Sequence, residues 1–94
     1  MGTPEAIPCV LCTALARRWR DPSDRLKGGR IYRCAVCGGR YAVTGDALAA
    51  LEGSAWDSAQ LLETVRQCIA VGKLPRIEKV SGRPHVVAVG SQIS

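Results

Sequence analysis

The sequence predicts a small α+β fold, in which a metal-bound β-hairpin module is followed by a helical segment and a C-terminal β-hairpin. Two Cys-x2-Cys pairs stand 21 residues apart, helical periodicity follows the second pair, and β-prone runs close the chain. A chain of 94 residues can form one compact domain, but it buries a modest fraction of its surface and its folded state is only marginally stable. We expect one domain, residues 1–94, with a metal module at 8–44, a helical part at 45–72 and a hairpin tail at 73–90.

The N-terminal part holds the first cysteine pair, Cys9-Val10-Leu11-Cys12, and then a polar, Arg-rich connection. That connection runs from Ala14 to Gly29 and includes Asp21-Pro22-Ser23-Asp24, a combination typical of turns. We expect a loop here, with one helical turn at residues 14–18.

The second pair lies between two short β-prone runs. Arg30-Ile31-Tyr32-Arg33 precedes Cys34-Ala35-Val36-Cys37, and Arg40-Tyr41-Ala42-Val43-Thr44 follows the tight turn that Gly38-Gly39 favour. This pattern predicts a hairpin with the two cysteines at its tip.

Two helices are expected next. Asp46 to Glu52 forms a short one, capped by Thr44 or Asp46, and a longer one runs from an N-cap at Ser54 to Gly72. The apolar side chains of the longer helix recur at spacings of three and four: Ala55, Ala59, Leu62, Val65 and Ile69.

The tail contains two further β-prone runs. Arg76-Ile77-Glu78-Lys79-Val80 and His85-Val86-Val87-Ala88-Val89 are separated by Ser81-Gly82-Arg83-Pro84. We expect a second hairpin, with Pro84 at a strand start or on an edge strand, where the missing N–H costs no ladder bond.

The four paired cysteines have the spacing of a structural zinc site. A two-residue gap lets the backbone curl around one ion, and two such curls complete the tetrahedral sulfur shell of a closed site. We therefore expect one Zn²⁺ per chain, held by Cys9, Cys12, Cys34 and Cys37. Redox use is less favoured, because a thioredoxin-like pair lies between a strand and a helix, whereas glycines and a strand follow Cys37.

The cell compartment is expected from the same residues. Five cysteines are an odd number for a disulfide framework, and the start of the chain has no signal-peptide pattern. The sequence also has no apolar run long enough to cross a membrane. We expect a reducing, cytoplasmic setting and no membrane partner.

The pattern Cys-x2-Cys, a long connection, and then Tyr32-x-Cys34-x2-Cys37-Gly38-x2-Tyr41 resembles the zinc-ribbon family over residues 8–44. The resemblance implies a rubredoxin-like β-hairpin module that binds nucleic acid or another protein. Rubredoxins, which hold iron with the same ligands, are similar only in part, because this chain is basic and lacks the proline expected beside the second pair.

The positive charge is concentrated around the cysteines. Residues 13–43 carry eight basic against two acidic side chains, a net of +6, while the whole chain carries +5. Arginine pairs with phosphates and Trp19 can stack on a base, so we expect this stretch to contact DNA or RNA. The candidate residues are Arg17, Arg18, Trp19, Arg20, Arg25 and Lys27. The alternative for Arg33 and Arg40, which lie beside the second pair, is that they balance the negative charge of a zinc–thiolate centre.

The alternative is a protein-interaction adaptor or homodimer without nucleic-acid contact, using the long helix or an open strand edge. Catalysis is not expected, because the acidic residues are scattered and no nucleophile has a nearby base. No small-molecule substrate is expected either. We expect Cys68 to be a small buried hydrophobic residue, and we expect His85, the single histidine, to have a structural role.

Overall fold

The structure, a computed structural model, describes residues 4–22 and 28–92. Its elements, in chain order, are β1 (Glu5–Pro8), β2 (Leu15–Arg20), β3 (Arg30–Cys34), β4 (Gly39–Val43), α1 (Gly45–Glu52), α2 (Ser58–Ala70), β5 (Lys73–Val80) and β6 (Arg83–Ser91). The predicted small α+β class is confirmed.

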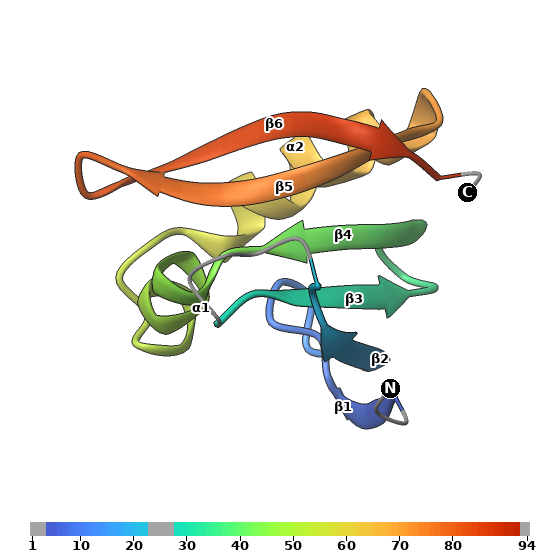
Figure 1. The fold of residues 1–94 in the computed structure, drawn as a ribbon, viewed down its shortest axis with the longest axis horizontal. Helices are drawn as coiled ribbons and strands as arrows, with labels where there is room; N and C mark the ends of the chain where they lie inside the picture. Colours follow the sequence, from blue (N-terminus) through green and yellow to red (C-terminus); the bar gives the residue numbers. More distant parts are fainter. Residues whose placement is uncertain (1–3, 23–27, 93–94) are drawn as a thin grey trace.

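Within the described residues, six strands form one mixed sheet in the order β1-β2-β3-β4-β5-β6 (Figure 1). Neighbouring strands are antiparallel except β4 and β5, which pair in parallel through Ala42–Arg76 and Val43–Ile77. A parallel pair needs a crossover connection, and α1 and α2 supply it. The tail hairpin therefore extends the sheet of the cysteine-bearing half.

The Arg-rich connection, residues 14–29, was expected to be a loop, and for residues 15–20 this prediction was wrong, while residues 23–27 lie outside the described part of the chain. Residues 15–20 form strand β2, which pairs with β1 on one side and β3 on the other. Pairing on both sides satisfies the backbone groups that a helical turn at 14–18 would have satisfied internally. Side chains alternate along β2, so Ala16 is buried whereas Leu15 and Arg17 are exposed.

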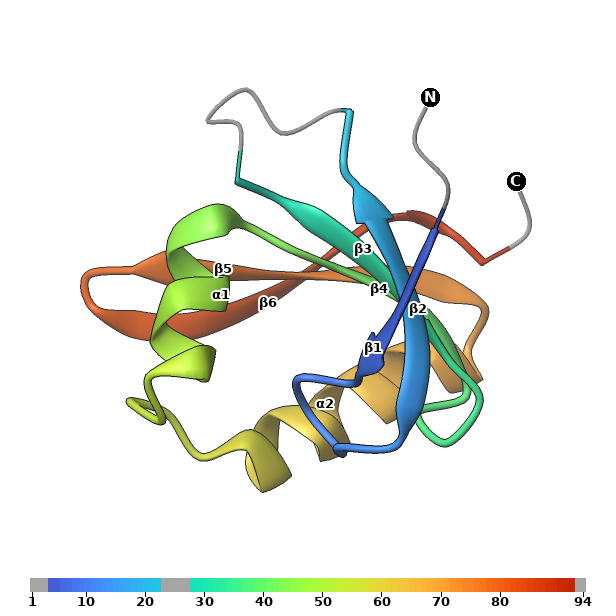
Figure 2. The same cartoon turned by 90° about the horizontal axis from the view of Figure 1, so that it is seen from below.

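The two faces of the sheet differ in what covers them. The core face carries Ala16, Tyr32, Tyr41, Val43 and Ile77, which form one buried cluster with the apolar side chains of both helices. The open face carries, on β2–β4, Leu15, Arg17, Trp19, Ile31, Arg33, Arg40 and Ala42, and none of these belongs to that cluster, although Ala42 is 2% exposed. Figure 2 shows the strong twist of the sheet and the two helices on one side of it.

The short helix agrees with its prediction, because Thr44 is its N-cap and its hydroxyl accepts from the N–H of Ala47. The longer helix begins later than expected. Asp57, not Ser54, is the N-cap, and its carboxylate accepts from two backbone N–H groups of the first turn. Ser54 instead has a left-handed backbone, with φ of 58°, which excludes it from the cap position.

Helix α2 buries Leu61, Val65 and Ile69, a row at spacings of four, while Ala59 stays exposed. Val65 and Ile69 of the predicted apolar stripe are thus buried and Leu62 packs against the core, whereas Leu61 takes the buried position expected for Ala59. Within the described part of the chain, neither helix is long and apolar enough to span a membrane.

The predicted C-terminal hairpin is confirmed. Strands β5 and β6 pair along their length, with a two-residue turn at Ser81-Gly82 and Pro84 on the edge strand. Beyond β6, the Gln92 side chain bridges two strands: its amide N–H donates to Arg40 O at 2.6 Å and Lys73 O at 2.9 Å, and its Oε1 accepts from Arg40 N at 2.9 Å.

Candidate metal centre

The four predicted ligands lie on two tight turns of the sheet. Cys9 and Cys12 lie on the turn between β1 and β2, which closes with Cys9 N–H donating to Ala14 O at 2.7 Å. Cys34 and Cys37 lie on the turn between β3 and β4, where Gly38 has φ of 101° and donates to Cys34 O at 3.1 Å. The left-handed angle favours glycine at this position.

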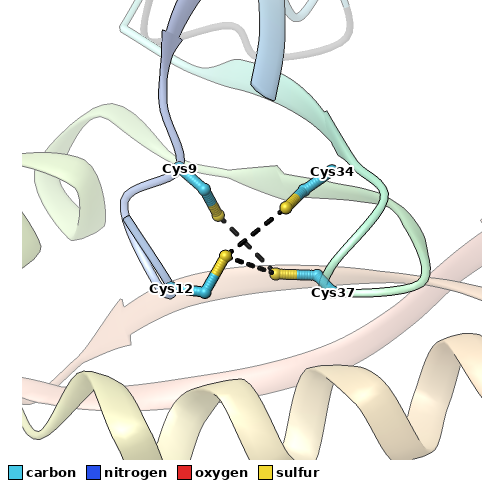
Figure 3. Close-up of side chains that lie close together, drawn as sticks. All are labelled: Cys9, Cys12, Cys34 and Cys37. Carbon is cyan, nitrogen blue, oxygen red and sulfur yellow. Dashed lines mark hydrogen bonds between the residues drawn. The ribbon is translucent and has the colours of Figure 1, made fainter. Parts of the chain in front are cut away.

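The structure brings the four sulfur atoms into one group, with every pair within 4.8 Å. The distances are 3.6 Å for Cys9–Cys37, 3.4 Å for Cys12–Cys34 and 3.7 Å for Cys12–Cys37. In Figure 3 the four side chains point from the two turns toward a common centre. A tetrahedron with metal–sulfur bonds of 2.3 Å has sulfur–sulfur edges of about 3.8 Å, so the spacing fits one ion.

The group is part of the hydrophobic core. Cys9, Cys34 and Cys37 are at most 2% exposed, and Cys12 is partly exposed. Helix α2 covers the second turn, since a Cβ built on Gly38 would lie 3.6 Å from the Ile69 side chain. With four sulfurs available, an ion bound here would have its tetrahedral shell filled by protein ligands, with only the Cys12 side of the site partly exposed.

A tyrosine supports the sulfur group. The Tyr41 hydroxyl donates to Cys9 Sγ at 3.0 Å, and Tyr41 is fully buried. Burial, and then its contact with Cys9, raises the pKa of Tyr41 above its usual value, so the hydroxyl keeps its proton and remains a donor. The sequence placed Tyr41 in the ribbon pattern but gave no signal of this role, which depends on β4 facing the first turn.

The thiols differ in acidity because they are so close. Hydrogen bonds, chiefly from Cys37 and also from Tyr41, lower the pKa of Cys9 to about 4 despite its burial. The same contact raises the pKa of Cys37, and burial raises the pKa of Cys12. Binding of an ion by all four sulfurs would require the thiols to release their protons.

Arg18, a predicted nucleic-acid ligand, is instead engaged with the core face. Its guanidinium donates to the Tyr32 hydroxyl at 3.1 Å and to the Glu5 carboxylate at 2.6 Å. The Glu5 contact raises the pKa of Arg18. The Tyr32 ring is in turn stacked on Tyr41, with centroids 5.2 Å apart. These contacts connect Cys9, through Tyr41 and Tyr32, to Arg18 on β2. The hydrogen bonds to Tyr32 and Glu5 leave the Arg18 guanidinium little freedom to bind phosphate.

The other predicted nucleic-acid residues are separated by the alternation of β2. Arg17 and Trp19 lie on the open face, while Arg20 follows Arg18 on the other side of the strand. Arg25 and Lys27 lie outside the described residues.

Strand pairing adds two residues that the sequence analysis had assigned to charge balance. Arg17 pairs with Arg33, and Arg33 pairs with Arg40, so three arginines form one cross-strand row on the open face. Cys34 and Tyr41 are on the opposite face. Only the register reveals this row, because the three residues are far apart in sequence.

Cys68 and His85 take no part in the sulfur group. Cys68 is a partly buried free thiol on α2, and His85 is exposed on β6.

Comparison of the sequence with protein-family models and curated proteins, and of the fold with solved structures, finds no match. The sulfur group and the open face are therefore the features from which a function can be inferred.

Proposed function

We propose that this chain is a small cytoplasmic zinc-binding protein that contacts nucleic acid as an accessory or regulatory module and carries out no catalysis. In this proposal Cys9, Cys12, Cys34 and Cys37 hold one Zn²⁺ per chain. Four sulfurs at tetrahedral spacing and nearly complete burial are typical of structural zinc sites, which leave no position open for a substrate.

The metal assignment is tested by elemental analysis and native mass spectrometry of the purified chain. Zinc predicts a colourless protein with one ion per chain, lost when Cys34 is replaced by serine and retained when Cys68 is. Iron predicts a red protein with thiolate-to-iron absorption, and a metal-free, stably folded chain would reject both metals.

The nucleic-acid part of the proposal is carried by the arginine row on the open face. Arg17 and Arg33 are exposed, whereas Arg40 is partly buried and, within the described residues, its guanidinium donates to the backbone oxygens of Ser91 and Gln92. Arg17 and Arg33 are thus the members of the row that are most accessible to a ligand. Neither of the two salt bridges among the described residues involves the row. Like charges directly opposite one another destabilise a sheet, so this row suits a surface whose charge is neutralised by a polyanion.

The charge-balance role of Arg33 and Arg40 is less consistent with this geometry. Both side chains leave the sheet on the face away from Cys34 and Tyr41, and no hydrogen bond joins either to a sulfur within the described residues. Their charge is thus directed at solvent or a ligand.

Binding is tested by fluorescence anisotropy with random-sequence DNA and RNA over a series of salt concentrations. Each phosphate contact contributes about 0.7 to 0.9 to the slope of log K against log salt. Arg33→Glu should weaken binding and flatten that slope, whereas Arg66→Glu, the same charge change at an exposed position on α2, should not. Equal effects of the two substitutions, or none, would reject the row as the contact surface.

A protein-interaction role remains the second candidate, because β6 pairs with a neighbour on one side only. Its edge is nine residues long and Val89 on it is 42% exposed. Unpaired strand edges accept a strand from another chain. Size-exclusion chromatography with light scattering would show a salt-independent dimer if a second copy binds there, and a monomer at all concentrations would argue against it.

A further inference from the structure

The open face of β2–β4 combines the arginine row with an apolar row beside it. Trp19 pairs with Ile31, and Ile31 pairs with Ala42, so these three residues form a second cross-strand row on the same face. Trp19 and Ile31 are partly exposed, whereas Ala42 is 2% exposed, so the accessible part of this row is Trp19 and Ile31. Along each of β2, β3 and β4 the two rows are two residues apart, a distance of about 6.6 Å. Cations and an aromatic platform thus lie side by side on adjacent strands.

Trp19 is available as a platform. It is only partly buried and lies outside the core cluster, unlike Trp56, which packs against that cluster and donates from its indole N–H to Gly82 O at 3.2 Å. Within the described residues the indole of Trp19 makes no hydrogen bond that would hold it in place. Large aromatic side chains usually pack in the core, so a tryptophan on the uncovered face of a sheet suggests a ligand surface.

The charges on the open face define the footprint. On β2–β4 the face carries three arginines and no acid, whereas on β5 the Arg76 guanidinium is already paired with Glu78 at 2.6 Å. A polyanion is therefore attracted to β2–β4 and not to β5. The arginine row spans two strand intervals, about 10 Å, which is enough for two or three phosphates and not for a long duplex tract.

We propose that this face binds single-stranded nucleic acid, with bases stacked on Trp19 and Ile31 and the backbone held by Arg17, Arg33 and Arg40. The inference rests on the nucleic-acid function proposed above and specifies its ligand class. In a duplex the base faces are hidden in the stack, so a duplex would use only the arginines. A single strand presents base faces and phosphates together, which matches the two adjacent rows.

The experiment compares a labelled 15-nucleotide dT strand with a 15-base-pair duplex, using the zinc-loaded full chain and salt-titrated anisotropy. The wild type should bind the single strand more tightly. Trp19→Ala should weaken single-strand binding by roughly 5- to 100-fold with an unchanged salt slope, because stacking is lost while the phosphate contacts stay. Trp19→Phe should recover part of the affinity, and circular dichroism would verify that both variants fold.

Fluorescence provides a second readout. In a Trp56→Phe variant the remaining tryptophan is Trp19, and its emission should be quenched by dT15 and not by the duplex. Duplex binding as tight as single-strand binding, with no effect of Trp19→Ala, would overturn this inference and leave the proposed nucleic-acid function standing. Absence of salt-sensitive binding to either probe would overturn both.

Discussion

Removal of the metal should unfold the protein, and this prediction tests the proposed architecture most directly. The four sulfurs join the β1–β2 and β3–β4 turns, and three of the cysteines lie in the same buried cluster as Tyr41, Val65 and Ile69. Without an ion, the four metal–sulfur bonds that would hold the two turns together are replaced by four unbonded thiols inside that cluster. The stability of the whole chain then depends on a small aliphatic core.

The expected size of the effect follows from two magnitudes. A folded chain of 94 residues has a stability of about 5–14 kcal/mol. Structural zinc sites contribute about 10–16 kcal/mol of binding free energy, which becomes folding free energy when the site exists only in the folded chain. The loss therefore matches or exceeds the total, so the chelated chain should have no cooperative thermal transition.

The assay is differential scanning calorimetry of the zinc-loaded chain, the chelated chain and a Cys34→Ser variant. Cys68→Ser is the matched control, because Cys68 is a partly buried free thiol outside the sulfur group. It should melt within a few degrees of the wild type. A chelated chain that melts cooperatively at nearly the wild-type temperature would refute the reasoning.

Three further substitutions test contacts around the centre and the helices. Tyr41→Phe removes the hydroxyl that donates to Cys9 Sγ and should lower zinc affinity about 10- to 100-fold in competition with a chromophoric chelator; an unchanged affinity would show that this donor is dispensable. Gly39→Ala should destabilise by about 1–3 kcal/mol in urea unfolding, since its Cβ would lie 2.7 Å from Gln92 Oε1, which accepts from Arg40 N, and 3.1 Å from the Ile69 side chain; a neutral result would mean that the Gln92 side chain turns away without cost. Asp57→Ala should cost about 0.5–2 kcal/mol through the lost N-cap of α2, while Ser54→Gly should not; the reverse order would restore Ser54 as the cap.

Local patterns in the sequence predicted most of the elements and the sulfur group. The Cys-x2-Cys spacing, the cap at Thr44 and the β-prone tail each depend on neighbours within a few residues, and all have counterparts in the structure. Strand β2 was missed because its Arg-rich composition conceals the period of two. On the buried side of β2, the strand presents the small side chain of Ala16 and the aliphatic part of Arg18, whose guanidinium donates to the Tyr32 hydroxyl.

The open face was not predictable for a different reason. Arg17, Arg33 and Arg40 are neighbours only because three strands pair in one particular register, and the parallel pairing of β4 with β5 is equally invisible in local patterns. Register depends on the whole sheet, and a shift of one residue exchanges the two faces of a strand.

Because Cys34 and Cys37 lie at the β3–β4 turn, an ion bound by the four cysteines would also fix the register of the strands that carry the arginine row. If that turn slipped by one residue, Arg33 would turn inward and Tyr32 would face solvent. An ion bound to both turns would forbid the slip, so a cell starved of that metal would lose the cationic surface together with the core.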